Sequence, residues 1–205
     1  MGKANWIKIH NNSYIMSRNL VFNEDKHEYL VDGVVWPSVT QIISILYDFN
    51  GIPTNNLEYA RRRGQAVHKA VEIFNLGQEF AEPLDPVIVP YLDAWKKFIA
   101  ETGMEITAAE QHLVHSRMPF CGTFDARGHR SREKWLLDVK AVNVLSRATG
   151  VQLAAYEQLT GEVLRRAAVK LNPDGTYVFQ EYDSRNDWSV FVACMTVYNF
   201  RNNHK

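Results

Sequence analysis

Cysteine is scarce in this chain, with only Cys121 and Cys194 among its 205 residues. Two cysteines cannot build a disulfide framework or a four-thiolate metal site. Long apolar runs are also missing, because no stretch approaches the roughly 20 apolar residues that a membrane-spanning helix needs. The opening segment, MGKANWIKIHNN, lacks the apolar stretch of a secretory signal peptide. We therefore expect an intracellular, cytoplasmic protein without membrane contact.

Net charge is missing too, since 23 basic residues balance 23 acidic ones. This balance argues against a general nucleic-acid coat protein, which would be basic overall. The basic residues nevertheless cluster at three places, 61–63, 127–134 and 165–170. Each cluster alone is typical of a solvated face, and the balance still leaves room for a local basic groove.

The apolar fraction of 46%, with 5 Trp, 9 Tyr and 10 Phe, is enough for a sizeable core. The chain shows no internal repeat, no low-complexity tract and no obvious linker. We therefore expect one domain over residues 1–205. Its segment 1–56 would contribute strands, a short helix and a loop, and its segment 57–205 would form the core.

Strand and helix patterns alternate along the chain. Strands are expected at 20–22, 29–31, 34–36, 104–116, 165–171 and 176–182. Helices are expected at 39–47 behind a capping box at Ser38, at 57–76 with Asn56 as N-cap, and at 87–101, 148–160 and 186–202. The segment 48–56 reads as a loop. This order predicts an α/β or α+β sandwich.

The stretch Cys121 to Ala141, CGTFDARGHRSREKWLLDVKA, has the pattern of a β-hairpin. Its first arm covers 122–127 and its second arm covers 135–142. The segment 128–134 between the arms is polar and basic, which is typical of a solvated turn.

The hairpin carries Asp125 in its first arm and Asp138 and Lys140 in its second. Side chains alternate along a strand, so Leu136, Asp138 and Lys140 share one face. Apolar residues on both faces indicate a strand buried on both sides. A carboxylate and an ammonium group there need pairing, hydration or a metal ion. This requirement is the first indication of a functional site.

The expected helix 57–76 carries Gly64 and His68 one turn apart, on or beside its apolar face. Glycine inside a helix costs about 1 kcal/mol relative to alanine. We expect close approach of another backbone at Gly64 as the compensation. His68 would then point inward, and the alternatives are a hydrogen-bonded core histidine, which is the commoner case, and a ligand or catalyst.

Two further segments carry chemistry-bearing side chains. The strand 104–116 holds Glu110, His112 and His115, and the two histidines fall on opposite faces, so they do not form a zinc pair. The helix 148–160 places Gln152 and Tyr156 one turn apart on the same face.

Taken in chain order, these groups resemble the motif series of a RecB-type nuclease of the PD-(D/E)xK superfamily. This superfamily includes phage and recombination exonucleases and the mitochondrial genome maintenance exonuclease. The matching residues are GQAVH at 64–68, Glu110, GTFDARG at 122–128, DVK at 138–140 and QLAAY at 152–156. The segment HEYLVDGVVWPSVTQII is also similar to the leader segment of such nucleases, so the resemblance covers most of the chain.

The resemblance implies a restriction-endonuclease-like core, with a mixed central sheet of about four or five strands flanked by helices. Residues 57–205 would then be the nuclease core. The implied activity is metal-dependent hydrolysis of DNA phosphodiester bonds. Some relatives hold an iron–sulfur cluster with four cysteines, and two cysteines imply no cluster in this chain. No Gly-x-x-x-x-Gly-Lys-[Ser/Thr] motif occurs, so a helicase partner would be a separate protein.

The resemblance also implies a metal site. Asp125 and Asp138 would supply hard oxygen ligands to Mg²⁺ or Mn²⁺, and the backbone carbonyl of Val139 would be a further ligand. His68 would complete the set and tilt it toward Mn²⁺. Lys140 would orient or deprotonate the attacking water and stabilise the transition state.

The remaining residues of the motifs are expected to position the substrate. Gln152 and Tyr156 would hold the phosphate or the lysine, and Glu110 would contact a second metal ion or order the basic residues. The segment 61–63, Arg61, Arg62 and Arg63, would grip the DNA backbone.

The leading hypothesis is a stand-alone metal-dependent DNA exonuclease that acts on linear ends in recombination, replication or repair. A recombination or replication protein would be its partner, and a phage-encoded protein would act in the host cytoplasm. The alternatives are a structure-specific endonuclease, a non-catalytic DNA-end-binding protein, and an unrelated protein with chance motifs. The last would leave His68, Asp125 and Asp138 far apart. The sequence leaves RNA as a substrate and the oligomeric state open.

Overall fold

The computed structural model describes residues 6–9, 13–16, 18–24, 26–48, 51 and 53–202. Positions 49, 50 and 52 of the expected loop, parts of the expected segment 1–56 and the last three residues of 57–205 lie outside the described residues. Near the N-terminus, β1 (Trp6–Ile9) and β2 (Ser13–Met16) pair antiparallel, and neither strand was predicted. Within the described ranges, each helix is too short or too polar to cross a membrane.

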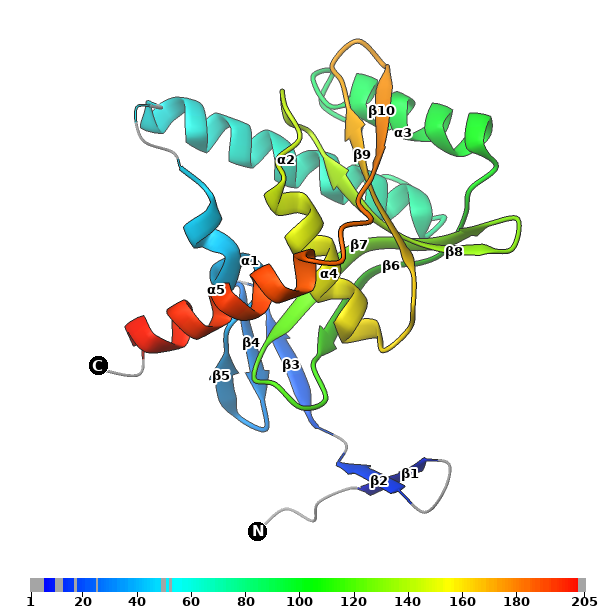
Figure 1. Cartoon of the computed structure of the whole chain (residues 1–205). Helices are drawn as coiled ribbons and strands as arrows, with labels where there is room; N and C mark the ends of the chain where they lie inside the picture. The colour runs from blue at the N-terminus through cyan, green and yellow to red at the C-terminus, as the bar shows by residue number, and fades with distance from the viewer. Residues whose placement is uncertain are drawn as a thin grey trace.

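A five-stranded sheet forms the centre of the fold (Figure 1). Its strands, in spatial order, are β10 (Tyr177–Glu181), β9 (Arg165–Leu171), β8 (Glu133–Lys140), β7 (Cys121–Arg130) and β6 (Glu105–Val114). Hairpins make the neighbouring pairs antiparallel, except that β8 and β9 run parallel. A parallel pair needs a crossover, and α4 (Ala148–Thr160) supplies it.

Helices cover both faces of this sheet. On one face, α2 (Thr54–Asn75) and α3 (Val89–Thr102) pack on a core that includes Trp95, Phe98, Trp135, Leu137 and Val139. The other face lies against α1 (Val39–Ile42), α4 and α5 (Asp187–Asn202). Strand β8 is therefore buried on both sides, as its sequence predicts.

That second face has its own core, which includes Phe124, Leu136, Leu153 and Phe191. Leu136 and Leu137 thus point to opposite faces, which confirms the predicted alternation along β8. The predicted fold class, an α+β protein with a mixed central sheet flanked by helices, is confirmed. This core is consistent with a restriction-endonuclease-like arrangement.

A separate three-stranded sheet, β3 (Leu20–Asn23), β4 (Glu28–Val31) and β5 (Val34–Trp36), precedes α1. All three strands were predicted. The capping box at Ser38 is also confirmed, since its hydroxyl accepts from the Gln41 N–H and the Gln41 side chain accepts from the Ser38 N–H. The expected helix to Tyr47 ends early, because a 3₁₀ helix, η1 (Ile43–Leu46), follows α1.

The predicted N-cap of α2 is wrong. The helix begins at Thr54, with Pro53 as its N-cap, instead of at Leu57 behind Asn56. The carbonyl of Pro53 accepts from the N–H groups of Asn56 and Leu57, so the first turn is already hydrogen-bonded there.

The predicted hairpin turn over 128–134 is too long. Strand β7 continues to Arg130 and β8 resumes at Glu133, so only Ser131 and Arg132 turn the chain, with Ser131 at a φ of 57°. Gly128 stays in the sheet because it packs against β6. A Cβ atom added there would lie 2.5 Å from the Glu105 carbonyl oxygen, so only glycine fits this contact.

A nearly buried ionic network joins α4, β9 and the start of α5. Arg166 lies 3.4 Å from Glu157 and 3.2 Å from Asp187, and it also donates to the Gly150 carbonyl. Removing the cation would leave two nearly buried carboxylates unpaired, which destabilises a fold strongly.

We expect Arg166→Ala to lower the free energy of unfolding by about 3 kcal/mol. Urea denaturation measures this change. Arg185→Ala, at an exposed position, is the matched control and should stay within about 0.5 kcal/mol of the parent protein. Equal stability of the two variants would contradict a structural role for the Arg166 network.

Candidate metal-binding site

A cavity of about 430 Å³ opens where α2, β7, the end of β8 and α4 meet the small sheet. Its lining carries the polar groups His27, Tyr29, Ser38, Thr40, Gln65, His68, Lys69, Glu72, Glu110, Thr123, Asp125, Lys140, Gln152 and Tyr156. The five motifs of the sequence thus converge on one cavity, with Asp138 bonded to the cavity residue Lys140. The hypothesis of an unrelated protein with chance motifs required His68, Asp125 and Asp138 to lie far apart, and they do not.

Asp125 lies at the centre of the site. One of its oxygens is 3.3 Å from His68 Nδ1, and the other accepts a 2.6 Å hydrogen bond from the backbone N–H of Val139. The register of β7 on β8 ends at Ala126 and Leu137, just before these residues. The strands therefore separate here, and the carboxylate takes the hydrogen bond of the Val139 N–H.

Glu110 reaches the site through an unusual backbone conformation. Its φ is 47° within β6, and the residues on either side, Ala109 and Gln111, pair with β7 while Glu110 does not. A left-handed conformation is unfavourable for a residue with a long side chain, and such strain clusters at functional sites. Here it accompanies a gathering of Glu110, His68 and Asp125, whose nearest ligand atoms all lie within 4.8 Å of one another.

Lys140 is held by a chain of hydrogen bonds on the same cavity. Its ammonium group is 3.0 Å and 2.8 Å from the two carboxylate oxygens of Asp138. It also donates to the Gln152 Oε1 atom at 3.1 Å, and Gln152 donates in turn to the Tyr156 hydroxyl at 3.1 Å. The predicted pairs Asp138–Lys140 and Gln152–Tyr156 thus act as one chain that fixes the ammonium.

The pKa values of His68, Glu110 and Asp125 are shifted because these ionisable groups are buried close together. Burial lowers the pKa of His68, but the Asp125 carboxylate outweighs this effect and raises it to about 9. Burial and the neighbouring Asp125 raise the pKa of Glu110 to about 8. Although burial opposes it, the pKa of Asp125 is lowered, because His68, Lys140 and the Val139 N–H all stabilise its charge.

Burial and neighbouring charges also have opposite effects on the pKa values of Asp138 and Lys140. Burial raises the pKa of Asp138 to about 6, although the Lys140 ammonium opposes this rise. Burial lowers the pKa of Lys140, but Asp138 and Asp125 raise it above its ordinary value. Lys140 therefore keeps its proton at neutral pH, and burial also keeps Tyr156 neutral by raising its pKa.

These observations fit a divalent cation. Two carboxylates and an imidazole provide hard oxygen donors and one nitrogen donor, the set that suits Mg²⁺ or Mn²⁺. Burial and the nearby Asp125 carboxylate disfavour the charged form of Glu110 and so raise its pKa. A cation bound beside Glu110 would stabilise its negative charge. Asp138 is directed to Lys140 and does not belong to the three-residue group. Val139 reaches the site through its N–H, so its carbonyl ligand stays a prediction.

The three predicted DNA-gripping arginines are placed differently from one another. Arg61 is exposed, and Arg62 pairs with Glu58 on the surface of α2. Arg63 turns inward and donates to the carbonyl of Ala141 at 3.1 Å, just after the end of β8. Arg63 therefore holds the segment at Ala141 in place and does not extend from the helix surface as Arg61 does.

The expected close backbone contact at Gly64 is wrong. A Cβ atom added to Gly64 would meet no other heavy atom within 4 Å, because the glycine lies beside the cavity. His68, one turn further on, points into that cavity toward Asp125. His68 therefore lines the cavity beside Asp125, and its role as a metal ligand or catalyst stays a prediction.

The sequence did not predict that the three-stranded sheet β3–β4–β5 contributes residues to the lining of the cavity. Tyr29 on β4 is buried, and its hydroxyl lies 2.6 Å from Thr123 Oγ1. His112 Nδ1 lies 2.5 Å from Thr123 Oγ1 as well, and the His112 ring stacks on Phe22. A strand pattern showed where Tyr29 lies in the chain, but no local signal indicates that it meets β7, 94 residues away.

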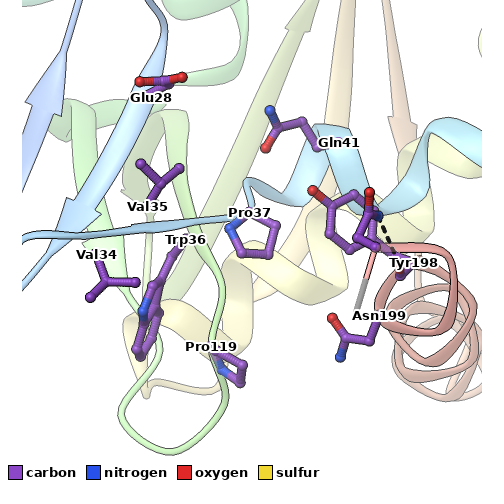
Figure 2. A pocket seen from close by; sticks show the side chains of 10 residues that line it. Glu28, Val34, Val35, Trp36, Pro37, Gln41, Pro119, Tyr198 and Asn199 are labelled. Atoms are coloured by element: carbon purple, nitrogen blue, oxygen red, sulfur yellow. Dashed lines mark hydrogen bonds between the residues drawn. The ribbon is translucent and has the colours of Figure 1, made fainter. Parts of the chain in front are cut away.

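A second groove of about 430 Å³ lies between β5 and the end of α5. Figure 2 shows Trp36 and Pro37 on one side of it and Tyr198 and Asn199 on the other. Among the described residues that line it, Glu28 is the only carboxylate and no histidine or lysine occurs. It therefore lacks the groups that the first cavity brings together.

We expect Mn²⁺ affinity to rise steeply with pH. Below about pH 8, both His68 and Glu110 carry protons that a metal ion must displace. Raising the pH removes these competing protons, so affinity should increase up to about tenfold per pH unit for each proton displaced, and level off above about pH 9. Calorimetric titration between pH 6 and 9, in buffers of different ionisation heat, counts the protons released.

Two variants sharpen this measurement. Glu110→Gln should release one proton fewer, whereas Glu105→Gln, an exposed change on the same strand, should behave as the parent protein. A pH-independent affinity would contradict binding at His68 and Glu110.

Fold and cavity together define an α+β protein with a site made of carboxylates, an imidazole and a fixed ammonium group. Among solved structures, the chain is similar to LHK-Exo in complex with dAMP, with 13% identity, a TM-score of 0.46, and coverage of 81% of this chain and 87% of that chain. It is also similar to the alkaline exonuclease LHK-Exo from Laribacter hongkongensis, with 14% identity, a TM-score of 0.40, and coverage of 82% and 91%. SSO0001 matches with 14% identity, a TM-score of 0.36, and coverage of 56% and 58%. No family model and no curated protein matches the chain.

Proposed function

We propose that this chain is a metal-dependent deoxyribonuclease of the RecB type that acts as an exonuclease on linear DNA. The observation that carries the proposal is the meeting, in one cavity, of the group His68, Glu110 and Asp125 with the fixed ammonium of Lys140. A metal site next to a stable cation is suited to a negatively charged substrate such as a phosphodiester.

His68, Glu110 and Asp125 would hold one Mg²⁺ or Mn²⁺ ion, and Asp138 and the Val139 carbonyl are candidates for further ligands. When bound, the ion would lower the pKa of a water molecule and neutralise charge on the scissile phosphate. The imidazole of His68 favours Mn²⁺ over Mg²⁺, because Mg²⁺ prefers oxygen ligands. The Val139 N–H orients Asp125 for this purpose, since it occupies the second carboxylate oxygen.

Lys140 would stabilise the charge that develops on the phosphate oxygens. Its raised pKa means that it donates hydrogen bonds instead of accepting a proton, so we favour this role over that of general base. Asp138 and Gln152 fix the ammonium by accepting its hydrogen bonds, and the Tyr156 hydroxyl fixes Gln152 by accepting a hydrogen bond from its side-chain amide. This preorganisation is what electrostatic catalysis requires.

The substrate would enter along the exposed side of α2. Arg61 and Lys69 are exposed cations on this helix, and Lys69 lines the cavity mouth. Contacts from such side chains to phosphates position a strand without reading its sequence. A role in recombination, replication or repair, with a protein partner from that process, belongs to the same proposal.

Digestion of end-labelled DNA tests the proposal. Linear single- and double-stranded DNA and covalently closed circular DNA are incubated with Mg²⁺, with Mn²⁺ or with EDTA. We expect metal-dependent loss of the linear DNA alone. Cleavage of the closed circle would favour the structure-specific endonuclease, and DNA binding without cleavage in either metal would favour the end-binding protein.

A further inference from the structure

Gly64 lies inside α2, ten residues after the helix begins at Thr54. Glycine is the least favourable residue inside a helix apart from proline, because it loses the most backbone freedom on folding. Neither of the usual structural reasons applies here. Gly64 has no positive φ, and a Cβ atom built on it would meet no heavy atom within 4 Å.

Two other glycines, both on β7, are needed because of contacts within the protein. A Cβ atom on Gly122 would lie 2.7 Å from the Tyr156 ring, and one on Gly128 would lie 2.5 Å from the Glu105 carbonyl oxygen. Both glycines are therefore required by contacts within the protein. Gly64 faces open space instead, and this space is the cavity that contains the candidate metal site.

The position of Gly64 in the helix places it beside the reacting groups. Residues three and four apart share a helix face, so Gly64 lies next to His68, about 6 Å along the axis. Exposed Arg61 lies one turn earlier on the same face. A substrate strand that reaches the group around His68 from the side of Arg61 must therefore pass Gly64.

We propose that Gly64 is a substrate-positioning residue, whose missing side chain lets the sugar–phosphate backbone of the DNA strand lie directly on α2, next to the scissile phosphate. This inference rests on the proposed nuclease function. A side chain at this position would lift the strand away from the metal site without touching the metal ligands. A displacement of about 1 Å at a catalytic centre can cost about 100-fold in rate.

The inference predicts opposite effects on folding and on catalysis. Gly64→Ala should leave the melting temperature unchanged or raise it by a few degrees, since alanine favours the helix. Its Mn²⁺ affinity should equal that of the parent protein. Its kcat/KM on an end-labelled oligonucleotide should fall severalfold, and that of Gly64→Leu should fall by about 100-fold.

Ala66→Leu is the matched control, because Ala66 is exposed and lies on a different face of the same helix. It places a leucine side chain of the same size on the helix but away from the cavity, and its cleavage rate should match that of the parent protein. The experiment therefore compares melting temperature, Mn²⁺ affinity and kcat/KM in four proteins, the parent and these three variants.

The outcomes separate this inference from the function on which it rests. A parent protein that cleaves no DNA would overturn the proposed function. If the parent protein cleaves DNA and Gly64→Leu cleaves it equally well, the inference alone is overturned. A large drop in melting temperature or in Mn²⁺ affinity of Gly64→Ala would also overturn it, because the glycine would then serve the fold or the metal site.

Discussion

Asp125→Asn should lower metal-dependent cleavage by at least about 1,000-fold while the protein stays folded. Asp125 is the group that the other site residues share, because it contacts His68 through one oxygen and the Val139 N–H through the other. An amide has nearly the same shape and retains one oxygen acceptor, so the Val139 hydrogen bond can persist. It lacks the negative charge that a divalent cation requires, and it no longer opposes the charge of Glu110.

The rate is measured on end-labelled linear DNA, and circular dichroism and thermal melting establish that the variant is folded. Asp93→Asn is the matched control, because Asp93 is an exposed residue of α3 that forms a surface ion pair with Lys96. The control should cleave at the parent rate. A folded Asp125→Asn protein with the parent activity would exclude Asp125 from the reaction.

Lys140→Met should lower kcat by about 100- to 1,000-fold, the usual effect of removing one donor that stabilises a developing negative charge. Methionine keeps most of the side-chain length and removes the ammonium. The loss of that partner leaves the buried Asp138 carboxylate without its cation, and its pKa should rise further above about 6. The group His68, Glu110 and Asp125 is unchanged, so Mn²⁺ affinity should change far less than the rate.

Single-turnover kinetics with saturating Mn²⁺ separate these two effects. Lys134→Met lies on the same strand, but Lys134 is exposed and pairs with Glu162 on the surface, so it serves as the control. A Lys140→Met protein that loses Mn²⁺ binding together with cleavage would show that Lys140 supports the metal site. An unchanged rate would remove Lys140 from the mechanism.

The parts of the fold that local patterns specify could be predicted from the sequence. Helix α4 begins and ends at the predicted residues, 148 and 160. Its end could be predicted because Gly161 takes the left-handed conformation that closes a helix. The hairpin of β7 and β8 was visible in its alternation and its basic turn. Where the prediction failed, as at Pro53 and at Gly128, the cause was a contact or cap that the pattern does not carry.

Several residues that line the cavity could be named from the sequence, but the way in which the backbone brings them together could not. Asp125, Asp138 and Lys140 follow from the hairpin, and His68 and Gln152 follow from helix spacing. The left-handed backbone of Glu110 could not be foreseen, because nothing in a strand pattern marks the residue where the ladder is interrupted. The wall that Tyr29 adds depends on contacts between distant segments, which local periodicity does not report.

The central claim is that His68, Glu110 and Asp125 bind a divalent metal ion, and calorimetric titration with Mn²⁺ at about pH 9 tests it most directly, since the competing protons are largely removed there. We predict saturable binding to the parent protein and to Lys140→Met, and its loss in Asp125→Asn. Absence of binding to the parent protein, or equal binding to Asp125→Asn, would contradict the account.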